Sequence, residues 1–127
     1  MNLDFASVWE MISDIVPENN ALICGDEIVS WKDYDDRSSK IASALSNAGL
    51  KANSKAGLYL NNSNEYLIGQ NAIFKIGGVP INVNYRYVAE ELIYLLDNSD
   101  SEAVFYHACY SSRTVSYTHL RAHETKR

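Results

Sequence analysis

The sequence predicts an α/β fold in which helices alternate with mostly parallel strands. From residue 30 onward, segments with apolar residues at helical spacing alternate with short apolar runs that are typical of buried strands. The joints between these segments are short and carry Gly or Asn. Strands separated by single helices must run parallel, with right-handed crossovers and helices on both faces of the sheet.

The first elements are predicted to be a helix and a hairpin. Residues 5–16 carry apolar side chains at helical spacing, namely Phe5, Val8, Trp9, Ile12 and Val16. Asp4 precedes them as the expected N-cap, and Pro17 ends the helix because it has no amide hydrogen to donate. Two short apolar runs at 21–24 and 27–31 are separated by a Gly-Asp pair, which is typical of a β-hairpin.

The alternating part of the chain begins at Ser30, which with Asp33 fits the capping pattern of a helix. One face of that helix is expected to carry Tyr34, Ile41, Ala42, Leu45 and Ala48. Gly49 ends it. The following elements are expected to be strands at 55–60, 79–83 and 103–106 and helices at 65–76 and 90–96. Val88 stands where the last helix begins, and a β-branched apolar residue is a poor N-cap.

Composition excludes several classes of protein. At 127 residues the chain is one domain or a piece of a larger one, and its 46% hydrophobic and 21% charged residues are ordinary for a globular protein. The net charge of −5 argues against a nucleic-acid partner. No apolar run approaches the length of a membrane span, and the N-terminus has no basic region typical of a secretory signal, so we expect a cytoplasmic protein. Cys24 and Cys109 fit no metal pattern and are expected to be reduced, mostly buried thiols.

Residues 115–125 have the sequence VSYTHLRAHET, which matches one reading frame of a transposase sequencing-library adapter. We therefore divide the chain into a native segment, 1–113, and a non-native tail, 114–127. The tail contains His119, His123 and Glu124, a spacing seen in metal sites, but these residues have a cause unrelated to metal binding. No metal site is expected. Residues 1–113 hold 8 basic and 15 acidic residues, so the native segment has a net charge of −7.

Three stretches in fixed order make this chain resemble the adenylate-forming enzymes, which include acyl-CoA synthetases, peptide-synthetase adenylation domains and luciferases. The stretches are PENNALICGDEIVSWKDYDDRSSKIASALSNAGL, SKAGLYLNNSNEYLIGQNAIFKIGGVPINVNYRY and AEELIYLLDNSDSEAVFYH. The resemblance runs from about residue 5 to residue 107, nearly all of the native segment, and the three stretches lie within residues 17–107. The stretch PINVNYRYVAEELIYLLDNSD is most similar to bacterial fatty-acid and steroid-acid CoA ligases.

The resemblance implies a reaction in two steps that uses ATP, Mg²⁺ and CoA. A carboxylate attacks the α-phosphate of ATP to give an acyl-adenylate and pyrophosphate, and the CoA thiolate then displaces AMP. The family performs the first step with a Gly-, Ser- and Thr-rich phosphate loop, whose clustered amides hold polyphosphate charge. No such loop occurs in residues 1–113, so we expect an inactive N-terminal fragment with an incomplete sheet and no catalytic residue. Its expected partners are the carboxylate and CoA of the parent enzyme, and the missing C-terminal part of its own chain.

Arg86 is the one candidate for a ligand contact, because the resemblance places a basic residue here near the CoA phosphates. The alternative is a solvated arginine that pairs with Glu90. Asn82 and Asn84 could bind substrate, but asparagine at a strand end more often closes a turn on its own backbone. His107 lacks a catalytic partner motif. The acidic cluster Asp33, Asp35 and Asp36 is expected to favour the dipole of a helix's first turn.

Three other functions are weighed against the CoA ligase. A dinucleotide-binding module would need a GxGxxG motif after a strand, but the turn after residues 55–60 is NNSNE. Only the resemblance to the adenylate-forming enzymes argues against a non-catalytic, flavodoxin-like interaction module. An adenylation domain that loads a carrier protein remains open within the same superfamily, and a carrier domain downstream would distinguish it.

Overall fold

The computed structural model describes residues 4–61, 63–84 and 88–106. The order of elements is α1 (Phe5–Ile15), β1 (Asn20–Cys24), β2 (Glu27–Ser30), α2 (Trp31–Asn47), β3 (Lys55–Tyr59), α3 (Asn64–Lys75), β4 (Val79–Asn82), α4 (Ala89–Asn98) and β5 (Ser101–Tyr106). The predicted α/β class is confirmed, and every predicted element is present with its ends shifted by a few residues. His107, Cys109 and the tail 114–127 lie outside the described residues.

The local sequence determines where the helices begin. The side chain of Asp4 accepts a hydrogen bond from the backbone N–H of Ser7 at 2.8 Å, so Asp4 caps α1 as predicted. Ser30 accepts in the same way from Asp33 at 3.1 Å and caps α2. Val88 stands at the N-cap of α4 and makes no side-chain capping bond, which confirms that this helix begins without the stabilisation that a polar cap provides.

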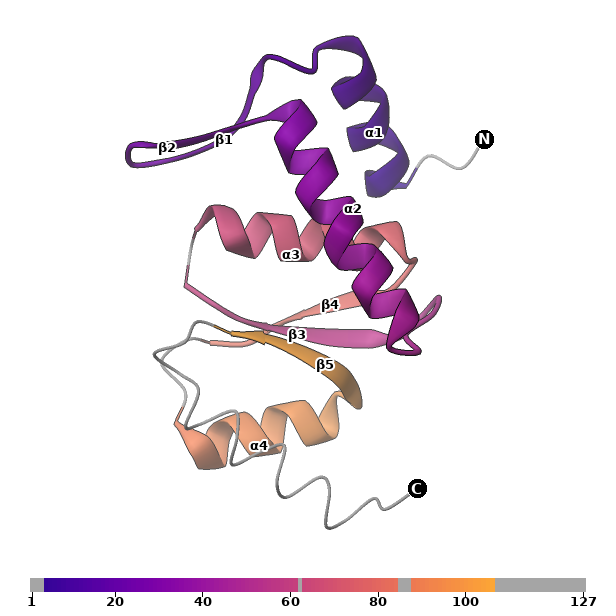
Figure 1. Cartoon of the computed structure of the whole chain (residues 1–127). Helices are drawn as coiled ribbons and strands as arrows, with labels where there is room; N and C mark the ends of the chain where they lie inside the picture. The colour runs from indigo at the N-terminus through magenta and orange to yellow at the C-terminus, as the bar shows by residue number, and fades with distance from the viewer. Residues whose placement is uncertain (1–3, 62, 85–87, 107–127) are drawn as a thin grey trace.

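The main sheet has three parallel strands in the order β4-β3-β5 (Figure 1). The chain runs from β3 to β4 on one side and then returns past β3 to β5 on the other side. Right-handed crossovers in opposite directions place their helices on opposite faces. Accordingly, α3 and α4 lie on opposite faces of the sheet (Figure 1). The hairpin of β1 and β2 is antiparallel and lies beyond α3, away from the sheet.

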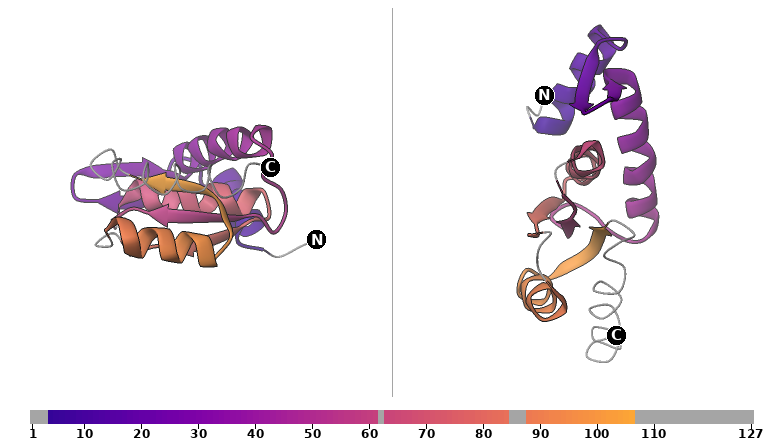
Figure 2. Two further views of the ribbon diagram at one scale, coloured as in Figure 1. Left: turned by 90° about the horizontal axis from the view of Figure 1, so that it is seen from below. Right: turned by 90° about the vertical axis from the view of Figure 1, so that its left-hand side faces the viewer.

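Alternation along β3 divides the core into two layers. Ala56, Leu58 and Leu60 are buried with Ile73 of α3 on one face. Tyr59 is buried with Leu92 and Leu96 of α4 on the other face. A third cluster joins Leu22, Val29, Tyr34 and Ile68 between the hairpin, α2 and α3. The layers are seen edge-on in Figure 2, where the N-terminal elements, α3, the sheet and α4 follow one another.

The prediction that Cys24 is mostly buried is wrong. Cys24 is exposed, because it is the last residue of β1 and lies next to the turn of the hairpin. Two apolar residues of the predicted helices are also exposed. Phe5, the first residue of α1, is 61% exposed, although its ring lies 5.4 Å from that of Phe74 of α3. Ala48, the C-cap of α2, is exposed as well.

Candidate functional site

The carboxyl ends of the parallel strands form the edge of the sheet at which a ligand site is expected. In open α/β sheets, ligands bind in the crevice outside the carboxyl ends of the strands, at the point where the strand order reverses. In the order β4-β3-β5 the chain passes from β3 to β4 on one side and then crosses to β5 on the other, so the reversal lies between β3 and β5. This topology directs the search for a site first to the ends of β3 and β5, and then to the turn after β4 at the same edge.

The turn after β3 is built by hydrogen bonds of Ser63. Its hydroxyl donates to the backbone oxygen of Asn61 at 3.1 Å and accepts from the backbone N–H of Tyr66 at 3.3 Å. Ser63 is thereby the N-cap of α3. The buried side chain of Asn64 donates to the backbone oxygen of Glu27 at 3.3 Å and ties this turn to the hairpin.

The turn after β4 is joined to α3 by Asn82. Its Oδ1 accepts a hydrogen bond from the hydroxyl of Tyr66 at 3.0 Å. This contact shows that our turn-closing interpretation of Asn82 is wrong, because the side chain bonds across the two strand ends. Burial raises the pKa of Tyr66 above its ordinary value of 10.0, so the hydroxyl stays protonated and remains a donor. Asn84 is exposed at the same edge, and Arg86 lies outside the described residues.

A small cavity lies at the carboxyl ends of β3 and β5. Its volume is about 180 Å³, and it is lined by Arg37, Ile41, Leu60, Glu65, Ile68, Phe105 and Tyr106. Arg37 and Glu65 bring opposite charges to its wall from α2 and α3. Ligand pockets are typically lined by apolar side chains with a few polar or charged groups, and this cavity has such a lining. Its volume is below the usual range of ligand pockets.

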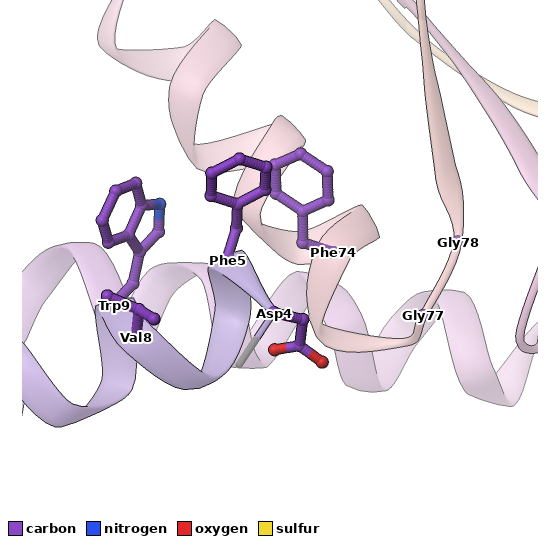
Figure 3. Close-up of a pocket in the computed structure, with 7 residues that line it drawn as sticks. All are labelled: Asp4, Phe5, Val8, Trp9, Phe74, Gly77 and Gly78. Carbon is purple, nitrogen blue, oxygen red and sulfur yellow. The ribbon is translucent and has the colours of Figure 1, made fainter. Parts of the chain in front are cut away.

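An open cavity of about 710 Å³ lies at the opposite, amino-terminal edge of the sheet. Figure 3 shows the side chains that line it, which are Asp4, Phe5, Val8, Trp9 and Phe74, next to Gly77 and Gly78. The rings of Phe5 and Phe74 lie 5.4 Å apart. The carboxylate of Asp4 is already used as the N-cap of α1, and this hydrogen bond lowers its pKa. The cavity therefore offers apolar surface but no chemistry, despite its volume.

The acidic cluster of α2 does more than our sequence analysis expected. Asp33 lies in the first turn, where its charge favours the helix dipole as predicted. Asp35 instead accepts a hydrogen bond from Nζ of Lys75 at 2.7 Å, and Glu10 accepts from the same atom at 2.9 Å. Burial lowers the pKa of Lys75, but the two hydrogen bonds and the attraction of both carboxylates outweigh it and raise the pKa. No sequence pattern indicates this triad, because its members are far apart along the chain.

Within the described residues, no group of three His, Cys, Asp or Glu side chains is placed to hold a metal ion. The same residues contain no helix that is both long and apolar enough to cross a bilayer.

Comparison with known proteins places this geometry in a family. The model of the AMP-binding enzyme family matches residues 13–127. The chain belongs to this family. A medium/long-chain-fatty-acid–CoA/3-oxocholest-4-en-26-oate–CoA ligase of Mycobacterium tuberculosis is 38% identical over 114 residues, which are 90% of this chain and 21% of the relative. A 3-oxocholest-4-en-26-oate–CoA ligase of Rhodococcus rhodochrous is 36% identical over 116 residues, or 91% of this chain and 21% of the relative.

A solved structure supports the fold independently. A benzoate CoA ligase from Burkholderia xenovorans superimposes with a TM-score of 0.86 at 17% identity, covering 93% of this chain and 24% of that one. The chain thus spans about a fifth of the length of the curated relatives that it matches. The predicted resemblance to the fatty-acid and steroid-acid type is confirmed, because both of these curated relatives are ligases of that type.

Proposed function

We propose that this chain is the N-terminal part of an AMP-forming acyl-CoA ligase that acts on a fatty-acid or steroid carboxylate. The observation that carries the proposal is the 38% identity to a ligase of this type, over 90% of the chain. The three-stranded sheet and its helices agree with the fold of a CoA ligase. The parent enzyme would use ATP and Mg²⁺ to form an acyl-adenylate and CoA to release the thioester, in the cytoplasm.

The part of the enzyme present here would supply scaffold and one wall of the CoA path rather than catalysis. The native segment, proposed to be residues 1–113, contains no phosphate loop. Arg86 follows β4 by four positions and is proposed to contact the CoA phosphates, since arginine binds phosphate with paired, charge-assisted hydrogen bonds. Its place in the sequence after the carboxyl end of β4 supports this role, because ligands of open α/β sheets bind at the carboxyl edge.

The test uses the full-length protein that contains residues 1–113, with ATP, Mg²⁺, CoA and a medium- or long-chain fatty acid or a steroid carboxylate. Pyrophosphate exchange reports the adenylation step, and thioester release reports the second step. We expect both activities in the wild type. Absence of exchange with every carboxylate tested would refute the proposed function. Thioester formation on a carrier protein, with none on CoA, would favour the carrier-loading alternative.

Arg86→Ala is expected to slow thioester formation and to leave pyrophosphate exchange nearly unchanged. A contact made only in the thioester-forming state stabilises only that transition state. Loss of a charge-assisted contact costs on the order of 1.5–3 kcal/mol, or roughly ten- to a hundredfold in rate. Equal loss in both steps would show that Arg86 is a structural residue, such as a partner of Glu90.

A further inference from the structure

The two outer strands of the main sheet, β4 and β5, each have one open edge. In the order β4-β3-β5, β3 is paired on both sides, and within the described residues no strand pairs with the outer edge of β4 or of β5 (Figure 1). The backbone groups along such an edge can pair with a further strand unless the sequence prevents it. The sequences of β4 and β5 differ in this respect.

Pro80 closes the outer edge of β4. The backbone N–H groups of Val79 and Val83 donate to the backbone of the β3 segment, at 2.8 and 3.2 Å. Backbone groups of successive residues in a strand point to opposite sides, so those of Pro80 and Asn82 point away from β3. Proline has no N–H to donate, and within sheets it is confined to edge strands, strand starts and bulges. The sequence of β4 is therefore that of an edge strand.

The outer edge of β5 carries no such block, since Ser101–Tyr106 contains no proline. The backbone oxygen of Leu58 in β3 accepts from β4, so the neighbouring residues Gly57 and Tyr59 face β5. In a parallel pair, a residue that faces its partner strand bonds to the two neighbours of the residue opposite to it. Val104 and Tyr106 lie opposite Gly57 and Tyr59 in the register, so their own N–H and C=O groups point outward. These groups are available to a further strand.

The side chains of β5 also indicate a missing neighbour. Ala103, Val104 and Phe105 pack against core clusters on the two faces of the sheet, yet all three are only half-buried. The residues opposite to them in β3 are buried, because β3 has a strand on either side. A strand placed against β5 would cover apolar side chains on both faces. It should therefore be apolar on both faces itself, as strands inside parallel sheets are.

We propose that a strand from the part of the parent chain beyond residue 113 joins the sheet at the outer edge of β5, and that β4 stays at the edge. The inference rests on the proposed function, in which this chain is about a fifth of a longer ligase. A segment of the same chain is favoured over a separate partner, because the covalent connection gives it a high effective concentration. Residues 1–113 have a net charge of −7, which opposes pairing between two copies.

Hydrogen exchange of the full-length protein, resolved to single amides by electron-transfer fragmentation, tests which edge is paired. The amides of Val104 and Tyr106 are expected to exchange at least roughly a hundredfold more slowly than the outward amide of Asn82, because a paired amide exchanges only when the structure opens. Exchange of Val104 and Tyr106 as fast as that of Asn82 would overturn the inference. Protection that disappears when the protein is diluted would also overturn it, since the strand would then come from a second copy.

Matched proline and alanine variants of the full-length protein give a second measurement. Tyr106→Pro removes an outward N–H of β5 and Asn82→Pro removes one of β4, while Tyr106→Ala and Asn82→Ala control for the lost side chains. We expect Tyr106→Pro to lower the melting temperature by roughly 2–6 °C more than Tyr106→Ala, because it removes a bond to the added strand. Asn82→Pro should match Asn82→Ala, since proline is tolerated on an open edge.

The inference and the proposed function can fail separately. Equal melting temperatures of Tyr106→Pro and Tyr106→Ala, or rapid exchange of Val104, in an active ligase would overturn the inference and leave the proposed function standing. A wild type without pyrophosphate exchange or thioester formation would refute the proposed function, whereas the exchange of Val104 is measured without substrate and reports the sheet alone.

Discussion

Lys75 joins three helices through one buried cation, and its replacement is the most informative structural test. Nζ lies 2.7 Å from Asp35 of α2 and 2.9 Å from Glu10 of α1. The side chain of Lys75 is only 9% exposed, whereas those of Asp35 and Glu10 are 29% and 50% exposed. The lysine therefore fastens both N-terminal helices to α3, and the stronger of the two pairs should be the one with Asp35.

The free energy that each ion pair of Lys75 contributes depends on how exposed the pair is to solvent. The half-exposed pair with Glu10 contributes on the order of 0.2–1 kcal/mol. The less exposed, charge-assisted bond to Asp35 contributes on the order of 1.5–3 kcal/mol. Lys75→Met keeps most of the aliphatic part of the side chain. It also removes the cost of burying the ammonium group, and this gain offsets part of the free energy lost with the two ion pairs. We expect a net loss of about 2 kcal/mol in the docking of α1 and α2, or roughly thirtyfold in the opening equilibrium.

Hydrogen exchange followed by mass spectrometry measures this loss locally in the full-length protein. Exchange of peptides from α1 and α2 should accelerate roughly thirtyfold at pH 7, because local opening exposes their amides. Peptides from α4 are the internal control, since α4 lies on the opposite face of the sheet. Lys40→Met is the matched control variant, because Lys40 is an exposed lysine on α2. It should leave every peptide unchanged.

A double-mutant cycle gives the result that would refute the reasoning. Lys75→Met combined with Asp35→Asn should show a larger coupling energy than Lys75→Met combined with Glu10→Gln. Equal couplings, or unchanged exchange in Lys75→Met, would mean that the triad does not hold the helices. The folded pKa of Lys75 lies above 10.5, so the contribution of the triad is fully present below pH 10.5 and is lost as the pH rises through the folded value.

Three further predictions concern the packing and the extent of the chain. Gly78→Ala should destabilise the protein by about 1–3 kcal/mol in urea unfolding, because the new Cβ would lie 2.8 Å from the backbone oxygen of Ser54 and 3.0 Å from Ile73; an unchanged midpoint would contradict this. Residues 1–113 expressed alone should melt without a cooperative transition, since the edges and faces of the sheet lack later elements; a sharp melt with dispersed amide resonances would show that the segment folds by itself. Deleting residues 114–127 should leave solubility and circular dichroism unchanged, and a marked loss would mean that the tail is native.

Sequence alone predicted the elements well, because their determinants are local. Asp4 and Ser30 cap helices through bonds that span three residues. Gly49 ends α2 with a φ of 102°, a backbone angle that favours glycine. The parallel pairing of the strands could also be predicted from the sequence, because strands of one sheet that are joined by single helices run parallel.

The contacts that sequence reasoning missed are those between residues distant along the chain. Lys75, Asp35 and Glu10 each look like ordinary solvated charges, and only the packing of three helices brings them together. The buried Ser38 hydroxyl donates to the backbone oxygen of Ile68 at 3.4 Å, although a serine within a helix suggests an exposed position. No periodicity or motif records such a contact, because periodicity describes one element and these bonds join two.

Asn82 illustrates how topology changes the meaning of a residue. On sequence evidence it was a polar residue at a strand end, where bonding to its own backbone is the common outcome. The order β4-β3-β5 places it beside the end of β3, and α3 brings the Tyr66 hydroxyl to its oxygen. The hydrogen bond joins the start of α3 to the end of β4, two segments that are 16 residues apart in the sequence. The bonding of Asn82 therefore depends on the path of the chain through the sheet and not on its neighbours in sequence.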